Sequence, residues 1–447
     1  MSNLPQEKII KAARAVIKAG KGFETEVSAH AYSARVLRFA GSVFHQGASH
    51  SDSDVYVRAI SKRKVGVAMC NSLSAALLKH CFEKAAGIAR HVKAEPFGLT
   101  LARPRAYADI NSYFKATERI SPRQAASVLS KGFKKAARLG VLLSGALITK
   151  SGALSVVNSN GVEAHHPYTS AHLSVVGTKD GASGISTAFS KDMSDIDISA
   201  VTGDSVRACL LARSPKDLRP GVYRALLWPQ AVSELLYWLA YIGFGSKNFH
   251  EGTSFLSGRL GEKVTGDNVT IYDDGLNPCG MSVPFDMEGV PKKKTVLIEN
   301  GTAKGVVYDN FTAGSFGVKT TGNASFPEDA EGPLPSHVFM EGGLASADEM
   351  VRALDTGIIV KSFHYVNGLL SPRNSLMTGM TRHGAFYVKN GRVKYPVNPL
   401  RFTDSILSAF SRIELASRET KLFQNHDFPL SSISAPAVLI DGFSFTG

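Results

Sequence analysis

Alternating apolar and polar residues dominate the stretch between positions 140 and 178. The runs GVLLSGALITK, GALSVVNSNG and SAHLSVVGTK have the two-residue period of strands that bury one face. Turn-forming residues separate these runs at 150–152 and 158–161, so the pattern predicts a meander of antiparallel strands. We therefore expect an antiparallel sheet in the first half of the chain.

The segments before this meander contain both helical and strand-like patterns. The helical period of 3.6 residues recurs in three amphipathic segments: 5–19, 73–93 and 122–138. Ser72 is the expected N-cap of the second helix, and Ser121 and Pro122 supply the cap and the first position of the third. Strand-like runs are expected at 24–40, 53–60 and 64–69. The first half is therefore mixed α and β.

A segment rich in Gly, Ser and Asp at 178–196 is the best candidate for a domain boundary. After one more helix, at 198–213, the sequence consists mainly of short strand-like runs punctuated by glycine. Long helical patterns recur there at three places: 229–242, 346–355 and 402–415. We therefore expect an α/β (α+β) protein, with an N-terminal mixed α/β domain at 1–196 and a C-terminal, mostly antiparallel β domain at 197–447.

The composition indicates a globular protein in a reducing compartment. The length of 447 residues suits two or three domains, and the hydrophobic fraction of 44% suits a chain with a substantial core. No run approaches about 18 apolar residues, and the N-terminus lacks the apolar segment of a signal peptide. We therefore expect a cytoplasmic protein without a membrane span. The four cysteines form no CxxC pair and are expected to be reduced: Cys70, Cys81, Cys209 and Cys279.

Basic residues exceed acidic ones, with 51 Lys and Arg against 38 Asp and Glu. The excess is scattered along the chain, and no basic motif is interleaved with aromatic residues, so binding to nucleic acid is not favoured. The densest basic run, at 292–294, is expected to be a solvated loop before a strand.

Common nucleotide-binding and hydrolase motifs are missing from the sequence, since it contains no GxGxxG after a strand, no GxxxxGK[ST] and no GxSxG. His250 and Glu251 form a His-Glu pair like that of helical zinc motifs, but no histidine follows one helical turn later. His165 and His166 lie beside Pro167 and are expected in a surface turn, because neighbouring strand residues point to opposite faces and would not share a metal.

Several segments resemble one known family: TSFLSGRLGEKV at 253–264, PFDMEGVPKKKTVLIENGTAKGVVYDNFTA at 284–313, SPRNSLMTGMTRHGAFYVKNGRVKYPV at 371–397, RFTDSIL at 401–407 and PAVLIDGFSFTG at 436–447. They are similar to the TldD/PmbA family of metallopeptidases, strongly over 220–447 and only in the order of elements before that. The resemblance implies a two-subunit peptidase. In it, a TldD-type subunit carries an HExxxH zinc helix and a C-terminal cysteine ligand, and a TldE (PmbA)-type subunit pairs with it.

In a TldD-type chain the zinc helix ends shortly before a Gly-Thr-Ser in the sequence. Here Gly-Thr-Ser stands at 252–254, so the zinc helix corresponds to residues 228–244. This stretch contains no histidine, and residues 280–447 contain no cysteine. The resemblance therefore implies a TldE-like subunit without a cofactor of its own, while zinc is expected in a TldD-like partner. The heterodimer would degrade or process unfolded or extended peptides.

Contacts with a peptide or with the partner are expected at Arg373, Thr378 and Arg382. Arginine binds carboxylates in a two-pronged geometry, and an exposed edge of the glycine-rich strand from Thr378 to Gly384 can pair through its main chain with an extended peptide.

Two other functions stay open. In the first, a homodimeric hydrolase acts alone, with a site formed by His250, Glu251 and a further histidine, His364 or His383. In the second, the basic excess binds nucleic acid, which predicts an affinity that falls steeply with salt.

Overall fold

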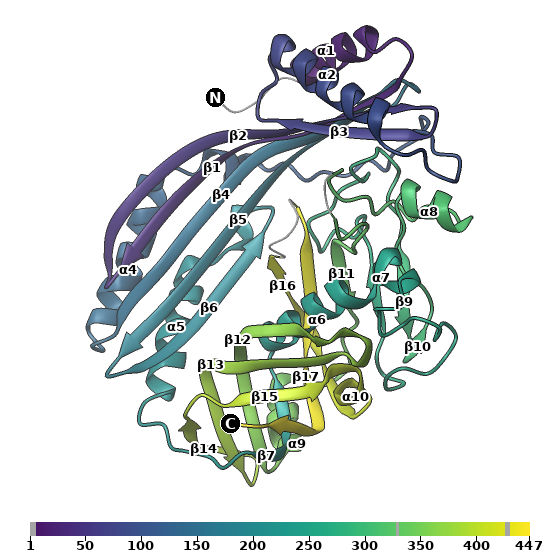
Figure 1. Cartoon of the computed structure of the whole chain (residues 1–447). Helices are drawn as coiled ribbons and strands as arrows, with labels where there is room; N and C mark the ends of the chain where they lie inside the picture. Colours follow the sequence, from purple (N-terminus) through teal and green to yellow (C-terminus); the bar gives the residue numbers. More distant parts are fainter. Residues whose placement is uncertain (1–5, 328–329, 425–429) are drawn as a thin grey trace.

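The computed structural model describes residues 6–327, 330–424 and 430–447. Within these ranges the strands form two sheets, one built mainly from each half of the chain (Figure 1). Helices cover one face of the first sheet, whereas both faces of the second sheet are partly covered. The predicted class, mixed α and β with antiparallel strands, is confirmed.

The first sheet is antiparallel throughout, in the order β3-β2-β1-β4-β5-β6. Its strands are β1 (Glu24–Ala40), β2 (Val43–Ser61), β3 (Lys64–Cys70), β4 (Leu142–Asn158), β5 (Glu163–Lys179) and β6 (Ala182–Ser190). The predicted turn at 158–161 joins β4 to β5, but the predicted turn at 150–152 is wrong, because β4 continues through it. Gly152 serves close packing instead, since a Cβ there would lie 2.5 Å from the Ala31 carbonyl oxygen.

Two pairs of helices cover one face of this sheet. The helical segments of this half are α1 (Gln6–Ala19), α2 (Ala75–His91), α3 (Lys115–Arg119), α4 (Pro122–Ala137), η1 (Met193–Asp195) and α5 (Ile198–Leu211). α1 and α2 pack near one end of the strands, and α4 and α5 pack near the other (Figure 1). α4 begins as predicted, with Ser121 and Gln124 forming a capping box, whereas Ser74 rather than Ser72 caps α2. Position 5 of the first predicted helix lies outside the described residues.

The segment at 178–196 is regular structure and not an irregular linker, because it contains β6 and η1. Helix α5 then packs into the core of the first sheet through Ile198, Val201 and Cys209. The division of the chain at residue 196 stays a prediction, and the packing of α5 favours a later position.

His165 and His166 lie within β5, so the prediction of a surface turn is wrong. His166 is buried, and its Nε2 lies 3.2 Å from the carbonyl oxygen of Ser282. β6 pairs with β5 only from Ala171 onward, so Pro167 lies where β5 has an open edge. A strand edge tolerates the missing N–H of proline, and β5 therefore passes through this position without turning.

The second sheet is larger and mostly antiparallel, which confirms the expected β-rich second half. Its main order is β10-β9-β8-β11-β17-β15-β13-β12-β7, with β14 beside β13 and β16 beside β17. The strands are β7 (Gly221–Leu227), β8 (Ile271–Asp273), β9 (Thr295–Glu299), β10 (Thr302–Ala303), β11 (His337–Met340), β12 (Gly357–Ser371), β13 (Leu376–Lys389), β14 (Arg392–Val397), β15 (Arg401–Ser405), β16 (Ile413–Gln424) and β17 (Ser432–Phe445).

The helical segments of this half are α6 (Pro229–Gly243), α7 (Ser246–His250), α8 (Asn310–Phe316), α9 (Ala347–Leu354), η2 (Pro372–Asn374) and α10 (Ile406–Phe410). The predicted helix at 402–415 is wrong except for α10, because β15 and β16 occupy most of it. Phe402 of β15 is fully buried, with its ring centroid 4.5 Å from that of Phe363. Strand pairing with β13 buries this ring among the core aromatics, and that overrides the helical period.

The basic run at 292–294 is only partly solvated. Lys293 and Lys294 are exposed, but Lys292 is 8% exposed and its Nζ donates to Ser336 Oγ at 3.0 Å. The prediction of a solvated loop is therefore wrong for Lys292, because its ammonium has a buried hydrogen-bond partner.

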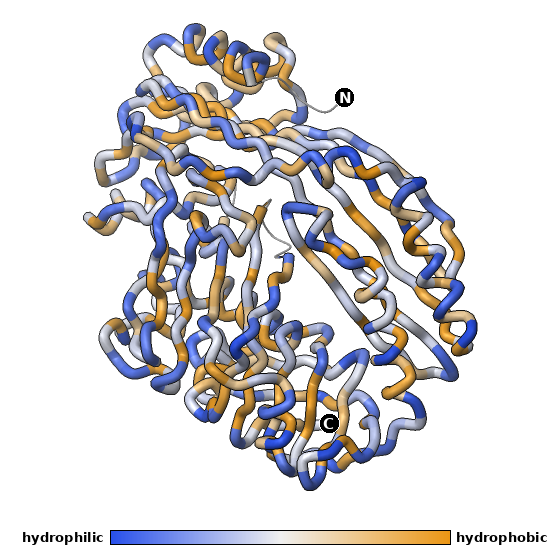
Figure 2. The backbone as a smooth tube through the Cα atoms, turned by 180° about the vertical axis from the view of Figure 1, so that it is seen from behind, coloured by the Kyte–Doolittle hydropathy of each residue, from blue (hydrophilic) through white to orange (hydrophobic). Residues whose placement is uncertain are grey.

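Polar contacts join the first sheet to the second half of the chain at two places along its strands. Arg58 of β2 forms an ion pair with Glu288, which follows β8 in the chain. Ser183 of β6 and His383 of β13 are hydrogen-bonded, with 3.0 Å between Oγ and Nδ1. Hydrophobic residues are spread over both halves (Figure 2), and none of the helices in the described ranges has the length and apolar character needed to cross a membrane.

Candidate functional site

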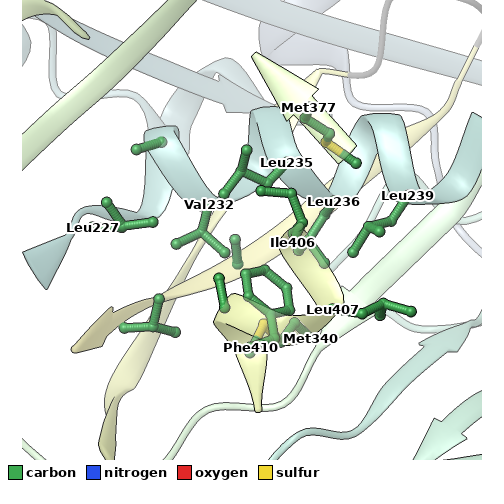
Figure 3. Close-up of a cluster of buried hydrophobic side chains, with 14 of the residues drawn as sticks. Leu227, Val232, Leu235, Leu236, Leu239, Met340, Met377, Ile406, Leu407 and Phe410 are labelled. Atoms are coloured by element: carbon green, nitrogen blue, oxygen red, sulfur yellow. The ribbon is translucent and has the colours of Figure 1, made fainter. Parts of the chain in front are cut away.

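Helix α6 is the core helix of the second half. It begins directly after β7, with Pro229 at its first position, where a missing N–H costs no hydrogen bond. Its leucines point toward α10 and β13, as the close-up shows (Figure 3). The cluster in that view includes Val232, Leu235, Leu236, Leu239, Met340, Met377, Ile406, Leu407 and Phe410. Each such side chain contributes about 1.5–3 kcal/mol through burial, so this face of α6 holds the sheet and α10 together.

The other face of α6 carries aromatic residues. The indole of Trp238 lies against Gly368 of β12, where a Cβ would come 2.8 Å from Trp238 Cε3. Tyr237 and Tyr241 flank this indole, with ring centroids 5.6 and 5.7 Å from it. The glycine therefore gives the tryptophan room to pack directly on the strand.

Glu234 is the acidic residue of this helix, and it is half-buried. It forms no hydrogen bond or ion pair with another of the described residues, and burial raises the pKa of its carboxyl above the ordinary value. The sequence from Ser233 to Trp238 reads Ser-Glu-Leu-Leu-Tyr-Trp, so the glutamate of an HExxxH pattern is retained while both histidines are replaced. The interpretation of the sequence missed Glu234, although the motif spacing alone identifies it.

The residues of α6 do not fit a zinc ion. The hydroxyl of the buried Ser233 donates to the Gln230 carbonyl oxygen at 2.9 Å, and the indole of Trp238 has an N–H but no lone pair for a metal. Across the described ranges, His, Cys, Asp and Glu side chains form no group of three or more that could hold a metal ion.

His250 and Glu251 lie at the end of α7, after α6. The imidazole of His250 stacks on Phe316 at 3.4 Å between ring centroids, and its Nε2 lies 3.0 Å from the Tyr308 hydroxyl. The next loop is fixed by Arg373 of η2, whose Nη1 donates to the Gly252 carbonyl oxygen at 2.6 Å. The structure therefore brings Arg373 and the His-Glu pair into one region.

Arg382 of β13 lies beside His364 of β12, with Nη1 2.8 Å from the imidazole Nε2. His383 contacts β6 instead, through Ser183. Burial lowers the pKa of His383 to about 4, with the charge of Arg382 and the nearby His364 contributing, and burial and Arg382 also lower the pKa of His364. Both imidazoles are therefore neutral at pH 7, whereas Arg382 is a charged and exposed group on this surface.

The first part of the segment from Thr378 to Gly384 is not an exposed edge. β13 pairs with β12 on one side, and on the other side it pairs with β15, as shown by Thr378 opposite Thr403. The Thr378 hydroxyl donates to the Phe402 carbonyl oxygen at 2.7 Å. The expectation that a peptide adds to this strand through its main chain is therefore wrong for residues 378–381, where both edges are already bonded, and it stays a prediction for residues 382–384, which lie between the pairings of β13 with β15 and with β14. Contacts through the side chains of Thr378, Arg373 and Arg382 stay a prediction.

Both sequence and fold match known proteins. Residues 220–447 match the PmbA/TldA metallopeptidase C-terminal domain. The "Metalloprotease TldD homolog" of Buchnera aphidicola is 26% identical over 407 residues, which is 85% of this chain and 82% of that protein. The protein of the same name from Haemophilus influenzae is 27% identical over 410 residues, again covering 85% of this chain and 82% of the relative.

The fold is similar to that of a solved archaeal protein. The crystal structure of TldE from Thermococcus kodakarensis superimposes with a TM-score of 0.88, covering 98% of this chain and 100% of that chain at 22% identity. With the domain match over residues 220–447, these likenesses show that the chain belongs to the PmbA/TldD family of metallopeptidases.

Proposed function

We propose that this chain is the zinc-free subunit of a heterodimeric metallopeptidase that degrades or processes unfolded or extended peptides. The observation that carries the proposal is the chemistry of α6, in which Ser233 and Trp238 replace the two metal-binding histidines. Trp238 packs on Gly368, so the space beside the helix is filled by an indole. Zinc and the chemistry of cleavage then belong to a TldD-like partner.

The contribution of this chain is to complete the peptide-binding surface. Arg373 of η2 and Arg382 of β13 are exposed, and their guanidinium groups suit a carboxylate of a peptide or of the partner. Thr378 lies on the same strand as Arg382. The likeness in fold to a protein called TldE, together with the sequence similarity to proteins called TldD homologs, supports a paired arrangement.

A cytoplasmic location completes this proposal. The four cysteines of the chain are free thiols in the structure, as expected in a reducing compartment.

Reconstitution tests the proposal. The purified chain should contain at most about 0.1 zinc per chain, as measured by elemental mass spectrometry, and should cleave no unfolded peptide. Mixing it with a TldD-like subunit should give a 1:1 complex and cleavage that a chelator abolishes. Stoichiometric zinc in the isolated chain, with proteolysis that a chelator removes, would overturn the proposal.

A further inference from the structure

Strand β2 has an open edge over more than half of its length. On one side it pairs with β1 from Val43 to Ile60, whereas on the other side β3 pairs with it only from Val55 onward. Among the described residues no further strand lies beside β2, and where β3 is absent β2 is the outermost strand of the first sheet (Figure 1). The main chain before Val55 therefore presents unpaired N–H and C=O groups on one side.

Two local features limit this open edge. At one end, β1 pairs with Phe44 and Gln46 but leaves out His45 between them, which is a β-bulge. At the other end, the N–H of Ser53 donates to Asp52 Oδ1 at 2.8 Å. Every residue from His45 to Asp52 is exposed, and none of them is a lysine or a proline, which commonly protect natural strand edges. The edge between the bulge and Ser53 is therefore open to another strand.

The direction of the free main-chain groups follows from Ser53. Its N–H bonds a side chain and not β1, so it points away from β1. In an antiparallel pair the main-chain groups of every second residue point to the same side. The N–H and C=O groups of Ser51, Ser49 and Gly47 therefore also point outward, beyond the range in which β3 pairs with β2.

These three outward-pointing residues are symmetric about Ser49. When the same edge of a second copy runs antiparallel to this one, Ser49 lies opposite Ser49 of the second copy, and Gly47 lies opposite Ser51. Each of these opposed residues then exchanges two main-chain hydrogen bonds with its counterpart. A shift of the register in either direction would bring in the bulge at His45 or the N–H of Ser53, which is already bonded.

The side chains suit this register. Gln46 lies opposite Asp52 of the second copy. Ala48 lies opposite His50, so no two like charges face each other. The amide oxygen of Gln46 accepts from Arg38 Nη1 at 3.3 Å, which leaves the amide NH₂ to donate to the Asp52 carboxylate of the second copy. Arg38 also places a positive charge near this carboxylate, and the edge is therefore complementary to itself.

We propose that two copies of this chain associate through the edge of β2, antiparallel and centred on Ser49, so that two first sheets join into one continuous sheet. Both copies use the same edge, so the association closes at a dimer and does not grow into a fibre. The inference goes beyond the proposed function and uses none of the residues assigned to it.

Analytical ultracentrifugation of the isolated full chain measures the association. We expect a reversible equilibrium between monomer and dimer, without larger species. Ser49→Pro should weaken the dimer about tenfold, because each copy loses an outward N–H that bonds the other. The pairing of β2 with β1 does not use this N–H, and circular dichroism checks that the fold is kept. Ser49→Thr, which retains the N–H, is the matched control and should dimerise like the wild type.

A charge at the same position provides a second variant. Ser49→Lys places two ammonium groups opposite each other at the centre of the pair, and it should also weaken the dimer. Because both charges are exposed, added salt should restore part of the association.

Cysteine variants test the register, in a Cys279→Ser background that removes the exposed native thiol. Ser49→Cys should give a disulfide-linked dimer on mild oxidation, because opposed residues of a bonded pair have Cα atoms about 5.5 Å apart. Ser51→Cys alone should not, since its counterpart lies about 13 Å further along the strand. Ser51→Cys mixed with Gly47→Cys should cross-link, and nothing lies within 4 Å of a Cβ added at Gly47.

A chain that stays monomeric at all concentrations overturns the proposal, and an edge reserved for an extended peptide or for a different subunit gives this result. A dimer that Ser49→Pro leaves intact, larger species, or a Ser51→Cys chain that cross-links as fast as Ser49→Cys also overturns it. These measurements contain neither zinc nor a second subunit. Their failure therefore leaves the reconstitution experiment readable, and failure of reconstitution leaves the dimer measurable.

Discussion

The Nη1 atom of Arg58 lies 2.6 Å from Oε1 of Glu288, and this ion pair joins the first sheet to the segment between β8 and β9 in the other half of the chain. The side chain of Glu288 is buried and that of Arg58 is 14% exposed, and the same Nη1 lies 3.3 Å from Oε1 of Glu26 on β1. Glu288 is held on its other side by the N–H of Asn310, which donates to Oε2 at 2.9 Å. A single guanidinium thus serves two buried carboxylates.

We predict that Arg58→Met destabilises the protein by about 3–5 kcal/mol, because it leaves the buried carboxylate of Glu288 without its counter-charge. Urea unfolding followed by circular dichroism measures the loss. The matched control is Arg14→Met, which removes the exposed ion pair to Glu163 and should have a much smaller effect. Equal losses in the two variants would contradict a special role for Arg58.

The buried carboxyl groups near Arg58 and Glu288 make the stability of the protein depend on pH. Burial raises the pKa of Glu26 to about 8 and that of Asp286 to about 7, against ordinary values of 4.5 and 3.8. The folded state therefore binds protons more tightly than the unfolded state between about pH 4 and pH 8, and the free energy of unfolding falls as pH rises through this window.

We expect a lower urea midpoint at pH 9 than at pH 6, and a smaller difference in Glu26→Gln, which cannot ionise. Glu163→Gln, at an exposed end of β5, is the matched control and should keep the wild-type difference. A midpoint that rises between pH 6 and pH 9 would be the wrong sign for this explanation.

Gly368→Ala should destabilise the protein by about 1–3 kcal/mol, since the new methyl group would overlap the indole of Trp238, at 2.8 Å from Cε3. Thermal unfolding measures the change. Gly87→Ala in α2 is the control, because nothing lies within 4 Å of its added Cβ, and it should gain up to about 1 kcal/mol of helix stability. A neutral Gly368→Ala would show that α6 is free to shift.

Glu234→Gln should leave peptide cleavage by the reconstituted complex within about twofold of wild type, because α6 has no histidine to hold a zinc ion beside this carboxylate. The rate with saturating peptide is the measurement, and the complex is first checked by size-exclusion chromatography. A tenfold loss in an intact complex would assign this glutamate a direct part in cleavage.

The thiols should react in a fixed order. Cys279 is exposed, whereas burial, with a contribution from Cys70, raises the pKa of Cys81 to about 12, and burial also raises that of Cys209. Maleimide at pH 7 should therefore label Cys279 first, and Cys81 and Cys209 only after unfolding, as read by peptide mass spectrometry. Cys279→Ser is the control, and rapid labelling of Cys81 in the folded protein would contradict the packing of α2 on β3.

Local signals predicted some elements of this fold to within a residue. Ser121 and Pro122 identify the start of α4 because capping chemistry depends only on neighbouring residues. The extent of β4 was not predictable in this way. Glycine is typical of turns, so Gly152 suggested one. Its actual role is to allow close packing against Ala31, which lies far away in the sequence.

Other parts of the site depend on contacts that a single sequence does not reveal. The missing histidines of α6 were identified from the family motif, but the packing of Trp238 on Gly368 needs the fold of β12. Arg58 and Glu288 are 230 positions apart, so no local pattern pairs them.

The two contacts of the first sheet with the second half of the chain also affect its mechanics. Glu26 pairs with Asn158 across the first sheet, so the Arg58 junction lies at one end of β4, whereas Ser183, opposite Thr178 and Leu142, places the second junction at the other end. A long sheet attached at both ends resists bending as a whole and has no single hinge about which to open.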